Sequence, residues 1–541
     1  MAGAPYYLAY TARPTPASSG GGGYGLFVVP SNALASTPLT VTNAPATVLG
    51  VAEQPTFDGS GNLTGRIPYG LIYATTNPGG NNHFYALPLD ATKAPAPAQL
   101  SSAGFPGFCG NFDFLTDKKQ ASSEVLLYAL PGSDGVCGTA DDLGFLIHYG
   151  DSATTTPTST ALSALAVENF NLFEVRNGDG TLAGLGSIDP SNNLVFSSDL
   201  SYAKPSVLLS QVSALQPDYN APGFCFITVT LQSGRSALYR VDNSGKLSNL
   251  LYQVQGNPQY DSGAADGAYF YFTDTAKVGT STSYSYSLNV VKVPLDGSAA
   301  AQVIASTSGD SGSSSGPFDS IAAFIGSTAF VAFDTGANTG NSFLDALDTA
   351  TAGAPLKRVL TAQNGSLGFS TTAADNRIFV AYTSAPAAGQ VDSYTTAVLD
   401  AAGNVVKQFA NTDLRGANYV LSGPSSSLFD IQSTVTAVYL AQGVSAAGPF
   451  DAGATLAKLD PSALITTPVT DGATGKPYVL DNGQFSIGGL FAVGMPANGS
   501  TDFVSVTNTG QQSDAVGFDA VNNVLYRFTN TANTNETAVN Y

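Results

Sequence analysis

The sequence predicts an all-β fold built from one repeated hairpin, and two features of the 541 residues indicate it. Short runs of β-branched and aromatic residues alternate with segments rich in Gly, Ser, Thr and Pro, which is typical of strands separated by turns. Few windows keep apolar residues at the i, i+3, i+4 spacing of a helix. The expected strands, in chain order, are YGLFVV (24–29), GLIYATT (70–76), HFYALPL (83–89), EVLLYAL (124–130), GFLIHY (144–149), NLVFSS (193–198), FCFITVTL (224–231), ALYRV (237–241), AYFYFTD (268–274), NVVKV (289–293), TAFVAF (328–333), RIFVAY (377–382), TAVYLA (436–441), DFVSV (502–506) and NVLYRF (523–528).

The repeated hairpin consists of an apolar strand, a turn with Asp or Gly, and a second strand. Its copies start near residues 83, 143, 193, 236, 289, 343, 395 and 454, and those at 83, 343 and 454 are weaker matches. A repeat of about 50 residues is typical of propeller blades with four strands each. We therefore expect a single closed β-propeller domain over residues 1–541, with about eight four-stranded blades and a range of seven to nine.

The ends of the chain and the turns of the hairpins support this prediction. Strands within 515–528 are expected to pair with the N-terminal strand 5–11, which would close the ring and leave no free sheet edge. In the turns Asp242–Gly245 and Asp400–Gly403, the Asp side chain can accept backbone N–H groups and the Gly can adopt a positive φ. Asp296 and Gly297 are expected to do the same in a shorter turn.

Two hairpins also carry a family resemblance. In ALYRVDNSGK (237–246) and VVKVPLDGSA (290–299), the chain resembles the TolB-like group of secreted and periplasmic bacterial β-propeller proteins. As architecture, the resemblance extends over about residues 20–530. It implies a fold rather than an activity, because propellers of this kind include proteases, lyases and pure binding proteins.

The composition limits the function classes. The 20 Lys and Arg residues against 39 Asp and Glu residues give a net charge of −19, which argues against nucleic-acid binding. Two His, three Cys and two Met residues leave few soft ligands for haem, zinc or copper, whereas calcium needs only oxygen ligands. No apolar run is long enough to span a membrane. Low charge and abundant Ser and Thr favour an extracytoplasmic, bacterial protein that is secreted, periplasmic or on the cell surface.

The segment PGSDGVCGTADD (131–142) is the densest group of chemically active residues, and it is expected to join two adjacent strands. Asp134, Asp141 and Asp142 could bind calcium, although the spacing is not that of an EF-hand. The alternative is that these acids are simply solvated. Cys137 is expected to form a disulfide with Cys109, which would tether so long a loop. Cys225 lies between two Phe residues and is expected to be a buried, inert thiol.

No catalytic set stands out in the sequence. GSSSG (312–316) matches the pattern of a nucleophile elbow, but no helix pattern follows it. His83 and His148 are interpreted as structural residues. These absences favour a non-catalytic scaffold that binds a protein or a glycan on one propeller face, with no certain cofactor. The alternatives are a hydrolase or lyase that uses carboxylates of the central channel, and a structural cell-surface component. The oligomeric state stays open.

Overall fold

A computed structural model gives the architecture of the chain. Every regular element in the described part of the chain is a β-strand, as the sequence predicts. Within that part, no helix has the length and apolar character needed to cross a membrane. The structure describes residues 7–12, 25–57, 63–77, 80–88, 90–100, 104–105, 107, 109, 113–116, 124–131, 133, 135–136, 143–149, 158–162, 172–178, 181–189, 191–198, 204–265, 268–279, 284–309, 319–334, 341–365, 367–385, 393–420, 434–444, 453–480, 483–486, 501–508, 513–519, 522–527 and 537–538.

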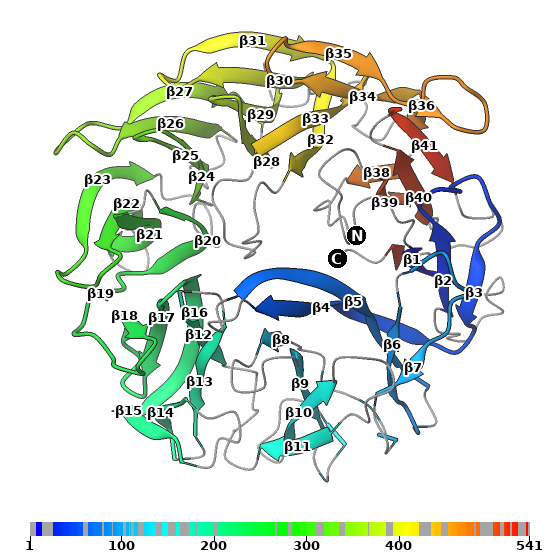
Figure 1. The fold of residues 1–541 in the computed structure, drawn as a ribbon. Coiled ribbons are helices and arrows are strands. Elements are labelled where there is room, and N and C mark those ends of the chain that lie inside the picture. The colour runs from blue at the N-terminus through cyan, green and yellow to red at the C-terminus, as the bar shows by residue number, and fades with distance from the viewer. Residues whose placement is uncertain are drawn as a thin grey trace.

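The described strands form ten sheets of four or five strands each, and Figure 1 shows these sheets following one another around a ring. The first five sheets in chain order are β3-β2-β1-β42, β4 to β7, β8 to β11, β12 to β15 and β16 to β19. Their strands are β1 (Tyr7–Ala12), β2 (Gly25–Pro30), β3 (Leu39–Thr42), β42 (Thr537–Ala538), β4 (Ala46–Phe57), β5 (Leu63–Thr75), β6 (Phe84–Leu87), β7 (Ala98–Gln99), β8 (Asp113–Thr116), β9 (Glu124–Leu130), β10 (Leu143–Tyr149), β11 (Thr158–Leu162), β12 (Phe173–Arg176), β13 (Leu182–Ile188), β14 (Asn193–Ser197), β15 (Ser206–Ser210), β16 (Val212–Ala221), β17 (Phe224–Leu231), β18 (Ser236–Asp242) and β19 (Tyr252–Gln253).

The remaining sheets are β20 to β23, β24 to β27, β28 to β31, β32 to β35 with β37, and β36-β41-β40-β39-β38. Their strands are β20 (Asn257–Ala265), β21 (Tyr269–Gly279), β22 (Tyr284–Pro294), β23 (Gln302–Gly309), β24 (Asp319–Ile325), β25 (Thr328–Asp334), β26 (Ser342–Asp348), β27 (Lys357–Ala362), β28 (Leu367–Ala374), β29 (Arg377–Ser384), β30 (Ser393–Asp400), β31 (Val405–Ala410), β32 (Thr412–Val420), β33 (Thr434–Gln442), β34 (Ala454–Asp460), β35 (Ile465–Pro468), β36 (Thr470–Asp471), β37 (Val479–Leu480), β38 (Gly483–Ser486), β39 (Thr501–Asn508), β40 (Ser513–Asp519) and β41 (Val524–Arg527).

The hairpin repeat in the sequence predicts eight of these ten sheets. Each predicted start falls at or next to the third strand of a four-stranded unit, from β6 near residue 83 to β34 near residue 454. The two sheets that the repeat missed, both built near the chain ends, are β3-β2-β1-β42 and β36-β41-β40-β39-β38. Their third strands lack the hairpin with its Asp–Gly turn, so the described part of the chain has more sheets than the eight expected blades.

The sequence predicts the wrong partner strands for the two ends of the chain. The strands within 515–528 pair with each other and with β39 and the parallel β36, instead of with residues 5–11. The N-terminal β1 pairs with β2 and with the short C-terminal β42, in the register Tyr10↔Ala538. The reason is that β36 occupies the open edge of β41, while β42 occupies the edge of β1.

The hairpin turns have the geometry that the sequence predicts. Asp242 Oδ1 accepts hydrogen bonds from the backbone N–H groups of Ser244 and Lys246, at 2.9 and 3.0 Å. Asp400 Oδ1 likewise accepts the N–H groups of Ala402 and Asn404. Gly245 and Gly403 both adopt φ +79°. The turn is therefore a locally encoded unit that the chain uses again in several sheets.

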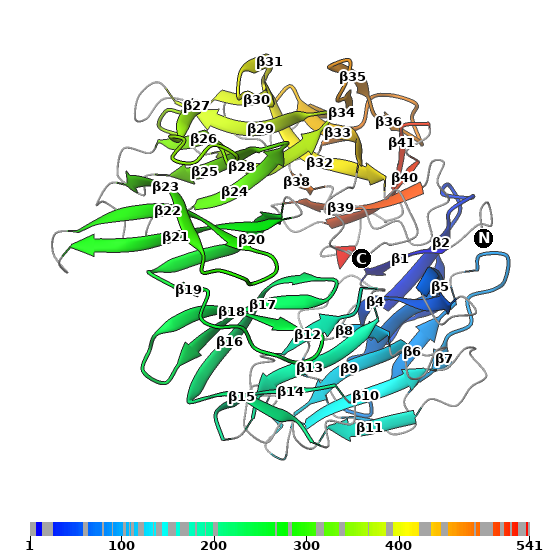
Figure 2. The same cartoon turned by 60° about the vertical axis from the view of Figure 1, so that its left-hand side comes forward.

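Several turn glycines also lie close against the preceding sheet. A Cβ at Gly245 would come within 2.3 Å of Phe196 Cδ1, and one at Gly403 within 2.5 Å of Val359 Cγ1. Phe196 and Val359 both belong to the sheet before the turn. Apolar layers continue these contacts between successive sheets, for example Phe226 against Phe270, whose ring centroids are 5.5 Å apart. Figure 2 shows successive sheets packed side by side, such as those that begin with β24 and β28.

Candidate functional site

The segment 131–142 joins adjacent antiparallel strands, because Leu130 at the end of β9 pairs with Leu143 at the start of β10. That part of the prediction is confirmed. Asp134, Asp141 and Asp142 lie outside the described residues, so calcium binding there stays a prediction. Among the residues that the structure describes, no group of three or more His, Cys, Asp or Glu side chains could hold a metal ion.

The cysteines are only partly covered by the structure. Cys225 is a buried free thiol, as expected. Burial raises the pKa of this thiol well above its usual value, and the negative charges of Asp218 and Glu174 raise it further, in keeping with the inert thiol expected. Cys109 is buried, but Cys137 lies outside the described residues. The disulfide between them therefore stays a prediction.

Of the two histidines and the serine motif, the structure describes only the side chain of His83. His83 Nδ1 lies 3.1 Å from Gln99 Nε2, and its ring meets Tyr85 edge-on. These contacts fit the structural role expected of His83. The backbone of His148 pairs with Val125 and Thr158 on the two neighbouring strands. The side chain of His148 is not among the side chains that the structure describes. Residues 312–316 also lie outside the described residues.

A cluster of polar side chains links the first strands of two neighbouring sheets, β12 and β16. Arg176 donates from Nε and Nη2 to Glu174 Oε1, both over 2.7 Å, and Asn220 Nδ2 donates to the same oxygen over 3.2 Å. Thr228 donates to Asp218 Oδ2 over 2.7 Å. The hydrogen bond from Asn220 on β16 to Glu174 on β12 ties the two sheets together.

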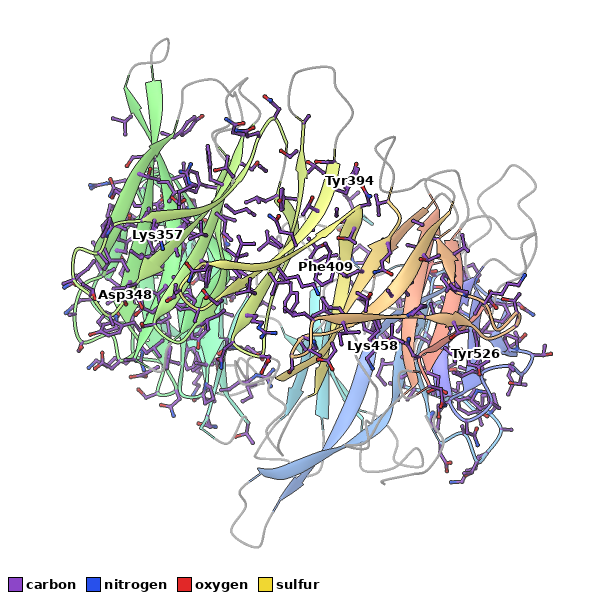
Figure 3. The ribbon with its side chains drawn as sticks, turned by 90° about the horizontal axis from the view of Figure 1, so that it is seen from above. Asp348, Lys357, Tyr394, Phe409, Lys458 and Tyr526 are labelled. Carbon is purple, nitrogen blue, oxygen red and sulfur yellow. The ribbon has the colours of Figure 1, made fainter. Side chains whose placement is uncertain are left out.

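Within the described residues, a candidate ligand site is a pocket of about 430 Å³ between the sheets β20 to β23 and β24 to β27. One wall is the outer strand β23, through residues 304–307, and the other is the hairpin of β26 and β27 with its loop 353–356. Pockets of roughly 300–1,000 Å³ are usual for small ligands. Asp348 at the end of β26 and Lys357 at the start of β27, on either side of the connecting loop, are labelled in Figure 3.

An ion pair forms the polar part of this pocket, which is named here the Asp345–Arg358 pocket. Asp345 on β26 and Arg358 on β27 are register partners, and Arg358 Nε donates to Asp345 Oδ1 over 2.5 Å. The Asp345 side chain is only 4% exposed, whereas the Arg358 side chain is 42% exposed. A buried carboxylate is therefore neutralised by a guanidinium that reaches the pocket and solvent.

Two aromatic rings fix the position of the guanidinium. Arg358 Cζ lies 3.6 Å from the ring centroid of Phe343 and 5.3 Å from that of Phe333. Phe333 and Phe343 are register partners on adjacent strands, and their rings are 5.5 Å apart. Cation–π contacts of this kind hold a guanidinium in one orientation without using its N–H groups. Within the described residues, Nε makes the only hydrogen bond of the guanidinium.

The second oxygen of Asp345 is also available to the pocket. Oδ2 makes no hydrogen bond within the described part of the chain, and it is not among the fully buried oxygens that lack a partner. Asp345 also lines the pocket, so Oδ2 is the acceptor that this residue can offer to a ligand there. The site thus offers one carboxylate oxygen and the two terminal amino groups of Arg358, held side by side.

The sequence contained a signal for this site that composition and motifs do not reveal. Asp345 stands three residues before the turn aspartate Asp348, in a strand where the other copies of the hairpin have Tyr239, Ala397 and Ala457. The copy at 343–360 is also one of the weaker matches to the repeat. The charge of Asp345, at a position of the repeat where the other copies have uncharged residues, indicates that this hairpin packs differently from the others.

No family model matches the chain, and no curated protein matches it. Solved structures similar to it include a puromycin hydrolase (14% identity, TM-score 0.31, 80% of this chain and 54% of that chain). They also include TolB from Acinetobacter baumannii (10%, 0.22, 68% and 78%) and the lectin BP39L from Burkholderia pseudomallei (12%, 0.29, 67% and 99%). The chain spans about half the length of the puromycin hydrolase structures that it matches.

Proposed function

We propose that the protein is a non-catalytic, extracytoplasmic β-propeller protein that binds a glycan or protein partner in the Asp345–Arg358 pocket. The observation that supports this function is a buried carboxylate and a half-exposed guanidinium at the wall of a cavity between two sheets. Binding sites commonly place a few oriented polar groups in an otherwise apolar cavity. The ring of successive sheets supplies a rigid frame for such a site.

The proposed architecture is one propeller domain whose terminal strands close the ring. The pairing of β1 with β42 supports it, since this pairing joins the two ends of the chain in one sheet. The extracytoplasmic location is supported by composition: charged residues are only 11% of the chain, and their net charge is −19. The predicted disulfide between Cys109 and Cys137 would suit the same oxidising environment.

A screen with a matched variant tests the proposed function. The wild-type protein and Arg358→Ala are each applied to a glycan array and used in pull-downs from an envelope fraction. The proposal expects at least one partner that the wild-type captures and the variant does not. If every captured partner is retained by Arg358→Ala, the pocket has no part in binding and the proposed function is wrong.

The rival function is a hydrolase or lyase that uses carboxylates near the centre of the ring. Glu174 and Asp218 on the first strands β12 and β16 are the described residues that could serve it. Glu174 Oε2 is buried without a hydrogen-bond partner, which is the observation in its favour. Turnover of chromogenic glycosides or peptides that disappears in both Glu174→Gln and Asp218→Asn would establish the rival.

The third function, a structural component of the cell surface, predicts self-association. Outer strands of several sheets expose one or two aliphatic side chains each, as scattered surface residues usually do. Light scattering over a wide concentration range separates this function from the proposed one. A constant monomer mass would count against a structural component.

A further inference from the structure

We infer that the Asp345–Arg358 pocket binds a neutral sugar through two hydroxyl groups on neighbouring carbons. The inference rests on the proposed function and specifies the class of its ligand. It follows from the donors and acceptors that the pocket offers, their charge balance and their fixed placement.

The pocket offers acceptor and donor groups next to each other. Asp345 Oδ2 can accept a hydrogen bond, and the terminal amino groups of Arg358 can donate. A hydroxyl group both donates and accepts, so one hydroxyl of a vicinal diol can donate to Asp345 while its neighbour accepts from Arg358. A carboxylate or phosphate can only accept, and it would leave Asp345 Oδ2 without a donor.

The charge balance also favours a neutral ligand. The carboxylate of Asp345 compensates the guanidinium, since Nε and Oδ1 are 2.5 Å apart. An anionic ligand would place a third charge beside the carboxylate, within a protein of net charge −19. A cationic ligand would meet the guanidinium. The pair therefore selects against both kinds of charge, and Asp345 Oδ2 and the two terminal amino groups of Arg358 stay available for hydroxyls.

The polar groups are held before any ligand arrives. The Phe343 ring supports the guanidinium at 3.6 Å, and the Asp345 side chain is 4% exposed. The surrounding wall has hydroxyls as well: Thr307 lines the pocket, and Ser306 donates to Asn289 Oδ1 over 2.8 Å. Preorganised polar groups reduce the entropy lost on binding, which is important for a weakly bound sugar.

Isothermal titration calorimetry with defined sugars tests the inference. The probes are methyl mannopyranoside and methyl glucopyranoside, their deoxy analogues that lack one hydroxyl of each vicinal pair, and methyl glucuronide. At least one neutral glycoside is expected to bind, and removing the critical hydroxyl should weaken binding about 10- to 100-fold, the effect of losing a hydrogen bond to a charged group. Asp345→Asn should weaken it by a similar factor.

A second variant blocks the pocket without removing its charges. Ser306 is an exposed residue of the pocket wall, so Ser306→Phe should leave the fold intact and abolish binding. Val303→Phe is the matched control, because Val303 is 49% exposed on the same strand and does not line the pocket. Val303→Phe should bind like the wild-type.

The possible results separate this inference from the proposed function. Tighter binding of the glucuronide than of the neutral glycosides would overturn the inference and leave the function in place. The same conclusion follows if no sugar binds but a captured protein is lost with Arg358→Ala. If neither sugar nor protein binding depends on Arg358, both are wrong.

Discussion

The chain uses a guanidinium stacked on phenylalanine at two junctions between sheets, with different results. Arg240 lies with Cζ 4.3 Å from the ring centroid of Phe224, and its Nε donates to the Leu295 carbonyl oxygen of the next sheet over 2.8 Å. Arg358 stacks on Phe343, but its Nε donates to Asp345 of its own sheet. Arg240 therefore bridges a junction, whereas Arg358 leaves a pocket beside it.

The turns show the same difference. Gly297 lies against Arg240, since a Cβ at this position would be 3.0 Å from Arg240 Cδ. Gly353, in the turn that lines the pocket, has nothing within 4 Å of its Cβ position. Both glycines have a positive φ, so conformation alone does not distinguish them. The same repeated hairpin therefore packs tightly against the neighbouring sheet or leaves a pocket beside it, depending on which side chains the neighbouring sheet places there.

The largest expected effect comes from separating the ion pair. Arg358→Ala leaves a 4%-exposed carboxylate without its counter-charge, whereas Asp345→Ala leaves a guanidinium that is already 42% exposed. We expect Arg358→Ala to lower the free energy of unfolding by about 3 kcal/mol and Asp345→Ala by about half as much. Urea denaturation measures both. Equal losses would show that burial of Asp345 does not determine the cost.

A pair of glycine substitutions tests the closed junction against the open one. Gly245 and Gly353 have φ +79° and +73°, but only Gly245 is packed, with Phe196 Cδ1 2.3 Å from the Cβ position. Gly353→Ala should cost about 1 kcal/mol from the left-handed backbone alone. Gly245→Ala should cost about 2–3 kcal/mol, because overpacking adds to that strain. Thermal unfolding of the two variants provides the comparison, and similar melting temperatures would contradict it.

Arg240 is expected to be structural. Arg240→Ala removes a charge-assisted hydrogen bond to Leu295 and a cation–π contact, which together contribute about 2 kcal/mol. Arg235→Ala, at an exposed position a few residues earlier, is the control and should change stability by less than about 0.5 kcal/mol. If the two variants unfold at the same urea concentration, Arg240 does not hold the junction.

The smallest effect on stability per residue is expected from protonation of the turn aspartates at low pH. In the turns of Asp296, Asp348 and Asp400, side-chain and then backbone hydrogen bonds from following residues lower the pKa of the aspartate. Similar bonds from Thr92 lower the pKa of Asp90 to about 2. A lowered folded-state pKa contributes stability above the unfolded value near 3.8, and the contribution is lost as pH falls through the folded value.

The protein should therefore lose the stability that its turn aspartates contribute as the pH falls from about 4 to about 2. Melting temperatures of the wild-type and Asp400→Asn over this range provide the check. The variant should melt lower than the wild-type at pH 7, and the difference should shrink as the pH falls. A difference that is independent of pH would show that the ionised Asp400 carboxylate does not stabilise its turn.

Local chemistry made most of the fold predictable. The turn aspartates accept the backbone N–H groups within two to four residues, so sequence alone identified these turns and eight of the sheets. The two sheets near the chain ends were missed because they lack the hairpin with its Asp–Gly turn, and the pairing of β1 with β42 also joins distant segments. The pocket was missed for a similar reason. Asp345 is an ordinary charged residue until the structure shows which sheet lies against it.

The central claim is that Arg358 binds a ligand while Arg240 holds two sheets together. The most direct test compares Arg358→Lys and Arg240→Lys, since lysine keeps the charge and loses the planar guanidinium. For each variant, both the melting temperature and the affinity for the best-binding neutral glycoside are measured. The account predicts that Arg358→Lys loses at least about tenfold in affinity with little change in melting temperature, and that Arg240→Lys does the reverse. Unchanged affinity in a folded Arg358→Lys, or equal loss of affinity in both variants, would contradict it.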